Sequence, residues 1–261
     1  MLITLSQLQK IIDKKPLKLT SSLNKEYNFL IKKINQQEEK AKKQGIAIPG
    51  PEILNREGGD STLVNNLYLS AVHFSNYLAV KKVIETLVTK RGYLAKTKIL
   101  GVGEGTGVFA YFMAQSIKPK LYLATDYQAW LVNYGQKVLG GDSLGFKQVD
   151  AISMDSIKND SFDIIVACEF IEHIPANSLV AFLKECKRVL KKDGVVIATT
   201  PNRSCHPGEK FSGYPPHFTE FTAKELSAFI EKRLAKVFKQ DLIFHLVNKG
   251  ICREKQRGFL L

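Results

Sequence analysis

A short apolar segment followed by four alternating glycines constrains this chain of 261 residues more than any other feature. Residues 98–110 are KILGVGEGTGVFA, with Gly101, Gly103, Gly105 and Gly107 at every second position before a helical pattern. Glycine has no side chain, so backbone N–H groups in such a turn can approach a ligand at the start of the next helix. The segment predicts a loop that binds a nucleotide-type cofactor. A frame that begins at Gly105 also fits a loose dinucleotide fingerprint, so this segment alone leaves the cofactor open.

Three further apolar segments, each ending in an acidic residue, follow the glycines. They are Lys120–Asp126, Gly145–Asp150 and Ser161–Glu169, and each has the length of a buried strand. Asp126 falls at the distance after the glycines at which a strand-end carboxylate accepts the two hydroxyls of an adenosine ribose. An aspartate is also common in strand-end turns, so each acid taken alone has a structural alternative.

The order of these segments resembles that of the class I S-adenosylmethionine-dependent methyltransferases. Two later features add to the resemblance: the pattern E-x-x-E-H in Glu169–His173, and D-G followed by T-P-N within Asp193–Asn202. The resemblance covers residues 97–232 and implies an α/β fold, with a Rossmann-like seven-stranded sheet flanked by helices. Such a sheet is mostly parallel and has an antiparallel last strand. Two strand-like runs at 237–247 and 251–261 match its sixth and seventh strands.

The resemblance implies S-adenosyl-L-methionine as the cofactor and assigns its contacts by position. The glycines would lie under the methionine and ribose, Asp126 would hold the ribose hydroxyls, and Asp150 and Ala151 would meet the adenine. The full cofactor-binding set is Gly101, Gly103, Glu104, Gly105, Gly107, Asp126, Tyr127, Asp150, Ala151, Cys168 and Glu169. Family members usually carry an acid where Gly101 stands, and we expect Glu104 to supply that charge from a different place.

The predicted catalytic residues are Glu172, His173 and His217. Methyl transfer from a sulfonium is an in-line displacement, and a hydroxyl acceptor also needs a base to take its proton, a task that histidine suits. If the segment after the fourth strand is helical, Glu169 and His173 share one helical face at the carboxyl end of that strand, where ligands bind in open α/β sheets. The structural alternatives are that His173 caps or packs a short helix and that His217 stabilises its loop.

Three functions remain open from the sequence. We expect O-methylation of a small-molecule acceptor such as a sugar or quinone precursor, without a metal. E-x-x-E-H with a later histidine also resembles the magnesium-binding set of RNA 3′-terminal 2′-O-methyltransferases, which makes that activity the alternative. The third possibility is a cofactor-binding regulatory protein without catalytic activity.

Residues 1–96 are predicted to form an N-terminal helical extension or lid, and residues 97–261 the methyltransferase domain. The extension shows helical periodicity at Ser22–Gln44 and again from Ser61 to Val88. The second of these helices carries Tyr68, His73, Phe74, Asn76 and Tyr77, which can face the acceptor or pack in a core. No run of eighteen apolar residues and no secretory leader pattern is visible, so we expect a cytoplasmic protein without a transmembrane segment.

The net charge of +13 is unevenly distributed along the chain. Residues 1–98 carry 17 basic and 8 acidic residues (+9), residues 99–180 carry 5 and 9 (−4), and residues 181–261 carry 16 and 8 (+8). Basic flanks can steer an anionic acceptor or a membrane surface toward the site, or they can be ordinary solvated helices. No basic stripe interleaved with aromatic residues is present, so RNA is the less favoured partner. The four cysteines are widely spaced and form no C-x-x-C pair, which argues against a zinc knuckle or a disulfide framework.

Overall fold

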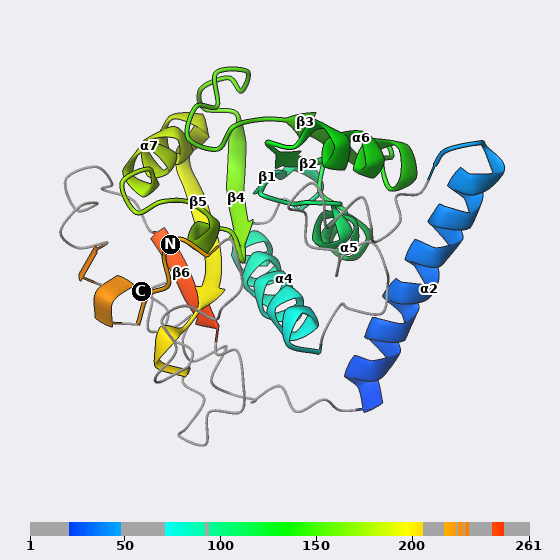
Figure 1. Ribbon diagram of the computed structural model, residues 1–261, viewed down its shortest axis with the longest axis horizontal. Coiled ribbons are helices and arrows are strands. Elements are labelled where there is room, and N and C mark those ends of the chain that lie inside the picture. The colour runs from blue at the N-terminus through cyan, green and yellow to red at the C-terminus, as the bar shows by residue number, and fades with distance from the viewer. Residues whose placement is uncertain are drawn as a thin grey trace. The chain divides into compact units, whose positions relative to one another are not determined.

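The computed structural model describes residues 21–47, 71–91, 94–205, 217–222, 224–226, 228–229 and 242–247 (Figure 1). Their helices and strands, in chain order, are α2 (Ser21–Lys43), α4 (Ala71–Arg91), η1 (Leu94–Lys96), β1 (Lys98–Val102), α5 (Val108–Ile117), β2 (Leu121–Asp126), α6 (Ala129–Val138), β3 (Leu144–Gln148), β4 (Phe162–Cys168), η2 (Ile171–His173), α7 (Leu179–Val189), β5 (Leu190–Pro201), η3 (Arg203–Cys205) and β6 (Leu242–Val247). They form two compact units. Unit 1 contains the described residues of Thr97–Val102 and Val149–Leu261, and unit 2 those of Leu17–Lys96 and Gly103–Gln148.

Unit 1 is built on a parallel sheet with the strand order β1-β4-β5-β6. Leu100 of β1 pairs with Ile165 of β4, which in turn pairs with Val196 of β5. Parallel strands are usually covered on both faces and are therefore continuously apolar. The second half of β5, Val195–Pro201, is buried at every position, and the apolar stripe of α7 packs beside this strand (Figure 1).

Unit 2 contains the parallel pair β2–β3, with α5 and α6 packed against it. The N-terminal helices α2 and α4 join this unit through a buried aromatic cluster. The ring of Phe74 on α4 lies 5.4 Å from Tyr27 on α2 and 5.4 Å from Phe112 on α5, between ring centroids, in edge-on geometry. Phe74, Asn76 and Tyr77 are all buried, as core packing of this helix requires. Tyr68 and the side chain of His73 lie outside the described part of the chain.

The strands and the longer helices predicted from the sequence are present over the described residues. The basic residues up to Lys191, with Gly194 just beyond them, favour a helix over 177–191, but α7 ends at Val189 and β5 begins at Leu190. Leu190 pairs with Phe162 of β4, so strand pairing begins before Gly194. Tertiary pairing overrides local helix propensity here.

The described residues have an α/β Rossmann-like fold with a parallel sheet and flanking helices. Six strands are described, and each pairing between two of them within a unit is parallel. The run predicted as the last, antiparallel strand, 251–261, lies outside the described residues, so a seventh strand stays a prediction. None of the described helices is long and apolar enough to cross a lipid bilayer.

Candidate active site

The glycine loop lies in unit 2, between the end of β1 and the start of α5. Gly103, Gly105 and Gly107 have φ angles of 67°, 56° and 84°, in the left-handed region that side chains disfavour. Gly107 is the N-cap of α5, and a Cβ atom there would clash with the ring of Phe146. Gly101 differs from these three glycines because it lies inside β1, opposite Val166 of β4. The loop conformation thus needs three of the four predicted glycines.

Asp126, the last residue of β2, holds the glycine loop through its carboxylate. Its Oδ2 accepts a hydrogen bond from the backbone N–H of Gly105 at 3.0 Å, and its Oδ1 accepts one from the N–H of Gln128 at 2.9 Å. The residue is 9% exposed, and this burial raises the pKa of the carboxyl although backbone hydrogen bonds oppose the shift. A carboxylate has about four acceptor positions, so two hydrogen bonds leave capacity for ligand hydroxyls. Tyr127, which follows, is 68% exposed.

Glu104 lies inside the same loop and is buried, with 9% of its surface exposed. Its Oε1 accepts a hydrogen bond from the hydroxyl of Tyr122 at 2.7 Å, and its backbone N–H donates to the carbonyl of Thr125 at 3.0 Å. Burial raises the pKa of this carboxyl to about 8, and the nearby Asp126 adds to the rise. Without a cation beside it, Glu104 therefore carries a proton at neutral pH, which limits the charge it can offer a cofactor.

The raised pKa of Glu104 makes stability depend on pH. The folded protein holds this proton up to about pH 8, whereas the unfolded chain releases it near the ordinary glutamate pKa of 4.5. The free energy of unfolding therefore falls as pH rises between these values. We expect Glu104→Gln, which is neutral throughout, to lose less stability than the wild type between pH 6 and 9, by about 1–3 kcal/mol. Urea denaturation at several pH values measures this difference. Glu39→Gln, at an exposed position on α2, is the control, and identical pH profiles for wild type and Glu104→Gln would contradict the assignment.

A sharp turn follows β4 in unit 1. Glu169 has a φ of 53°, and its N–H lies 3.0 Å from both the carbonyl and the Oγ1 of Thr199 on β5. The Thr199 hydroxyl lies 3.3 Å from the Sγ of Cys168, the last residue of β4. The left-handed residue prevents an α-helix from starting at Glu169, and only Ile171–His173 form a 3₁₀ turn. The shared helical face expected for Glu169 and His173 does not form.

Glu172, in that 3₁₀ turn, is the centre of a polar cluster. It is fully buried, and its Oε2 accepts a hydrogen bond from the hydroxyl of Thr200 on β5 at 2.9 Å. Its backbone carbonyl accepts from the N–H of Phe218 at 2.7 Å and of Thr219 at 3.2 Å. These bonds fix the segment that carries His217 beside the turn that carries His173.

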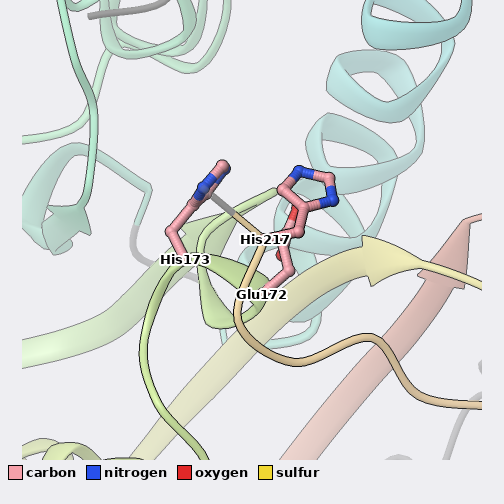
Figure 2. A group of neighbouring side chains, drawn as sticks. All are labelled: Glu172, His173 and His217. Carbon is pink, nitrogen blue, oxygen red and sulfur yellow. The ribbon is translucent and has the colours of Figure 1, made fainter. Parts of the chain in front are cut away.

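The two predicted catalytic histidines come together from distant parts of the chain. Their ring centroids lie 4.8 Å apart with the ring planes at 73°, and Figure 2 shows both imidazoles beside Glu172. One nitrogen of each ring and one carboxylate oxygen of Glu172 all lie within 4.8 Å of one another. The structure therefore brings Glu172, His173 and His217 into one group.

Glu220 joins this group and was not predicted from the sequence. Its Oε1 lies 2.6 Å from the Nδ1 of His217, and the two side chains are only 1% and 4% exposed. A glutamate three residues after the histidine in the same segment is the one local signal that could have indicated the pair.

Asp150 and Ala151, predicted beside the adenine, form a turn after β3. Asp150 is exposed, and its Oδ1 accepts a hydrogen bond from the N–H of Ile152 at 3.0 Å, as a strand-end turn residue does. Ala151 is 9% exposed. Their contact with a cofactor stays a prediction.

Part of the chain is similar to known methyltransferases. Residues 100–198 match the model of a methyltransferase domain. Over 117 residues the chain is 28% identical to a ubiquinone biosynthesis O-methyltransferase of Pseudomonas fluorescens (strain SBW25) and 26% identical to that of Pseudomonas aeruginosa (strain LESB58). Each match covers 45% of this chain and 50% of the relative, so the chain spans about half the length of the curated relatives it matches.

Solved structures of S-adenosylmethionine-dependent methyltransferases also align with the chain. The protein from Archaeoglobus fulgidus aligns with 59% of this chain and 68% of its own, at 16% identity and a TM-score of 0.45. The one from Aquifex aeolicus aligns with 57% and 78%, at 22% identity and a TM-score of 0.44. Residues 100–198 are thus similar to a methyltransferase domain.

Proposed function

We propose that this protein transfers a methyl group from S-adenosylmethionine to a hydroxyl group of a small-molecule acceptor. The observation that carries the proposal is the group of His173, His217 and Glu172, which the fold assembles together with the buried carboxylate of Glu220. A hydroxyl must lose its proton as its oxygen is methylated, so a histidine paired with a carboxylate is the kind of base this reaction uses. The similarity to methyltransferases supports S-adenosylmethionine as the cofactor.

The residues of the glycine loop fit the proposed cofactor. The three left-handed glycines give its backbone close access, and the Asp126 carboxylate has acceptor capacity for ribose hydroxyls. Gly101, Tyr127, Asp150, Ala151, Cys168 and Glu169 are the further proposed contacts. When bound, S-adenosylmethionine supplies a methyl group activated by a sulfonium.

The proposed acceptor is a small molecule because the curated relatives are named ubiquinone biosynthesis O-methyltransferases. The exposed Phe218 directly follows His217 and offers an apolar surface for such an acceptor. A cytoplasmic location and an anionic acceptor attracted by the basic flanks are parts of the same proposal.

Replacement of the two histidines separates acceptor chemistry from cofactor binding. We expect His217→Ala to lower kcat by about 10²–10⁴, because it removes the base, while the Kd for S-adenosylmethionine stays within about threefold. His173→Ala leaves the His217–Glu220 contact in place and should lose less. Steady-state kinetics over an acceptor panel and titration calorimetry measure the two effects. Normal turnover by His217→Ala would place the base elsewhere.

A second candidate is metal-dependent 2′-O-methylation of an RNA 3′ end, favoured by the close approach of one carboxylate and two imidazoles. Two nitrogen ligands suit a transition metal better than magnesium, which prefers an all-oxygen shell with several waters. Glu172, His173 and His217 would hold the ion, and the metal would orient the terminal ribose hydroxyls.

Chelation separates the two candidates. Under the small-molecule proposal, EDTA leaves the rate of methyl transfer within about twofold, because proton transfer to a histidine needs no ion. The RNA candidate instead predicts loss of activity with EDTA, recovery with manganese or magnesium, and a requirement for a free 2′,3′-terminal ribose. Its RNA binding would also weaken steeply with salt. Strict metal dependence with an RNA product would overturn the first proposal.

A further inference from the structure

The carboxylate of Glu220 is buried and contacts the ring of His217. Its Oε1 lies 2.6 Å from the Nδ1 of His217, and its Oε2 is buried without a hydrogen-bond partner among the described residues. Taking a carboxylate out of water is costly unless a partner compensates for the lost hydration. The His217 contact is therefore the main compensation that the described residues offer Glu220.

The segment around Glu220 is held at both ends, which fixes the pair in place. On one side the N–H groups of Phe218 and Thr219 donate to the carbonyl of Glu172. On the other side Phe221 forms a bridge with Asn202, and its carbonyl accepts from the N–H of Arg203 at 3.0 Å. The backbone that carries His217 and Glu220 is therefore fixed on both sides of Glu220.

If Glu220 is ionised, its carboxylate can only accept hydrogen bonds, and Nδ1 of His217 is then the donor in this contact. A neutral imidazole carries one proton, and if that proton is on Nδ1 the other ring nitrogen, Nε2, has the lone pair. The hydrogen bond at one nitrogen thereby decides which nitrogen can act as the base.

We propose that Glu220 is the positioning residue of this site: it fixes His217 in the Nδ1–H tautomer, so that Nε2 receives the proton of the acceptor hydroxyl. This inference rests on the proposed function and adds to it a specific base, a specific atom and a residue that orients it.

The proton and electrons balance in this step. The acceptor oxygen forms its bond to the methyl carbon with a lone pair, and the electrons of the breaking carbon–sulfur bond neutralise the sulfonium. The hydroxyl proton passes to Nε2 of His217. The imidazolium so formed keeps its Nδ1–H on Glu220, whose negative charge stabilises it in a site that is almost closed to water.

Nitrogen-15 NMR of the histidine rings tests the tautomer without any need for activity. In wild-type protein at about pH 8, the His217 signals, assigned by their absence in His217→Ala, should show a protonated Nδ1 and an unprotonated Nε2. In Glu220→Gln the side-chain amide can accept or donate, so the Nδ1–H population should fall. Glu225→Gln, a nearby exposed carboxylate that instead hydrogen-bonds the N–H of Thr222, is the matched control and should leave the signals unchanged. A wild-type ring protonated on Nε2 would overturn the proposal, even if Glu220→Gln failed to fold.

Kinetics provide the second readout. Glu220→Gln should lower kcat by about 10²–10⁴, with the acceptor KM and the Kd for S-adenosylmethionine within about threefold, and Glu220→Asp should recover part of the loss because it restores the charge. Wild-type kcat in a folded Glu220→Gln variant would overturn the positioning role. If the tautomer is as expected but no acceptor hydroxyl is methylated, the proposed function fails while the orientation of His217 by Glu220 stands.

Discussion

The hydrogen bonds of one buried residue, Glu172, hold the candidate active site together. Its side chain accepts from Thr200 on β5, and its carbonyl accepts from the backbone of the segment that carries His217. Leaving a buried acceptor without its donor costs about 1–3 kcal/mol, so these contacts are strongly favoured once the sheet has formed. The position of His217 relative to His173 follows from them, and so does the position of Glu220. A residue predicted as catalytic is therefore also the structural link between the strand ends and the segment after them.

Glu104 in the glycine loop and Asp126 at the end of β2 show how hydrogen bonding affects the pKa of two buried carboxyl groups. Asp126 receives two backbone N–H groups, which favour its charged form and oppose the effect of burial. Glu104 has mainly the Tyr122 hydroxyl, so burial dominates and its pKa rises to about 8. Asp126 thus suits a permanent acceptor for hydroxyl groups. Glu104 is suited to gain or lose a proton when a charged ligand binds nearby.

Much of the fold could be predicted from the sequence, because apolar strands, strand-end acids and glycines are local signals. The predicted strands are present over the described residues, and three of the four glycines have the expected loop role. The missed features depend on contacts between distant segments. Glu169 adopts a left-handed conformation and bonds to Thr199, which no helical pattern could indicate. Glu220 became a candidate only when the carbonyl of Glu172 and the bridge from Asn202 to Phe221 placed it beside His217.

Binding of S-adenosylmethionine measured by titration calorimetry tests the central claim most directly, because every proposed step depends on that cofactor. The wild type should bind S-adenosylmethionine and its demethylated product in preference to NAD. Asp126→Ala should bind S-adenosylmethionine about ten- to hundredfold more weakly, since it loses both a ribose acceptor and the bond that holds Gly105. Asp142→Ala, an exposed position before β3, should bind like the wild type. Unchanged affinity in Asp126→Ala, or tighter binding of NAD than of S-adenosylmethionine, would contradict the account.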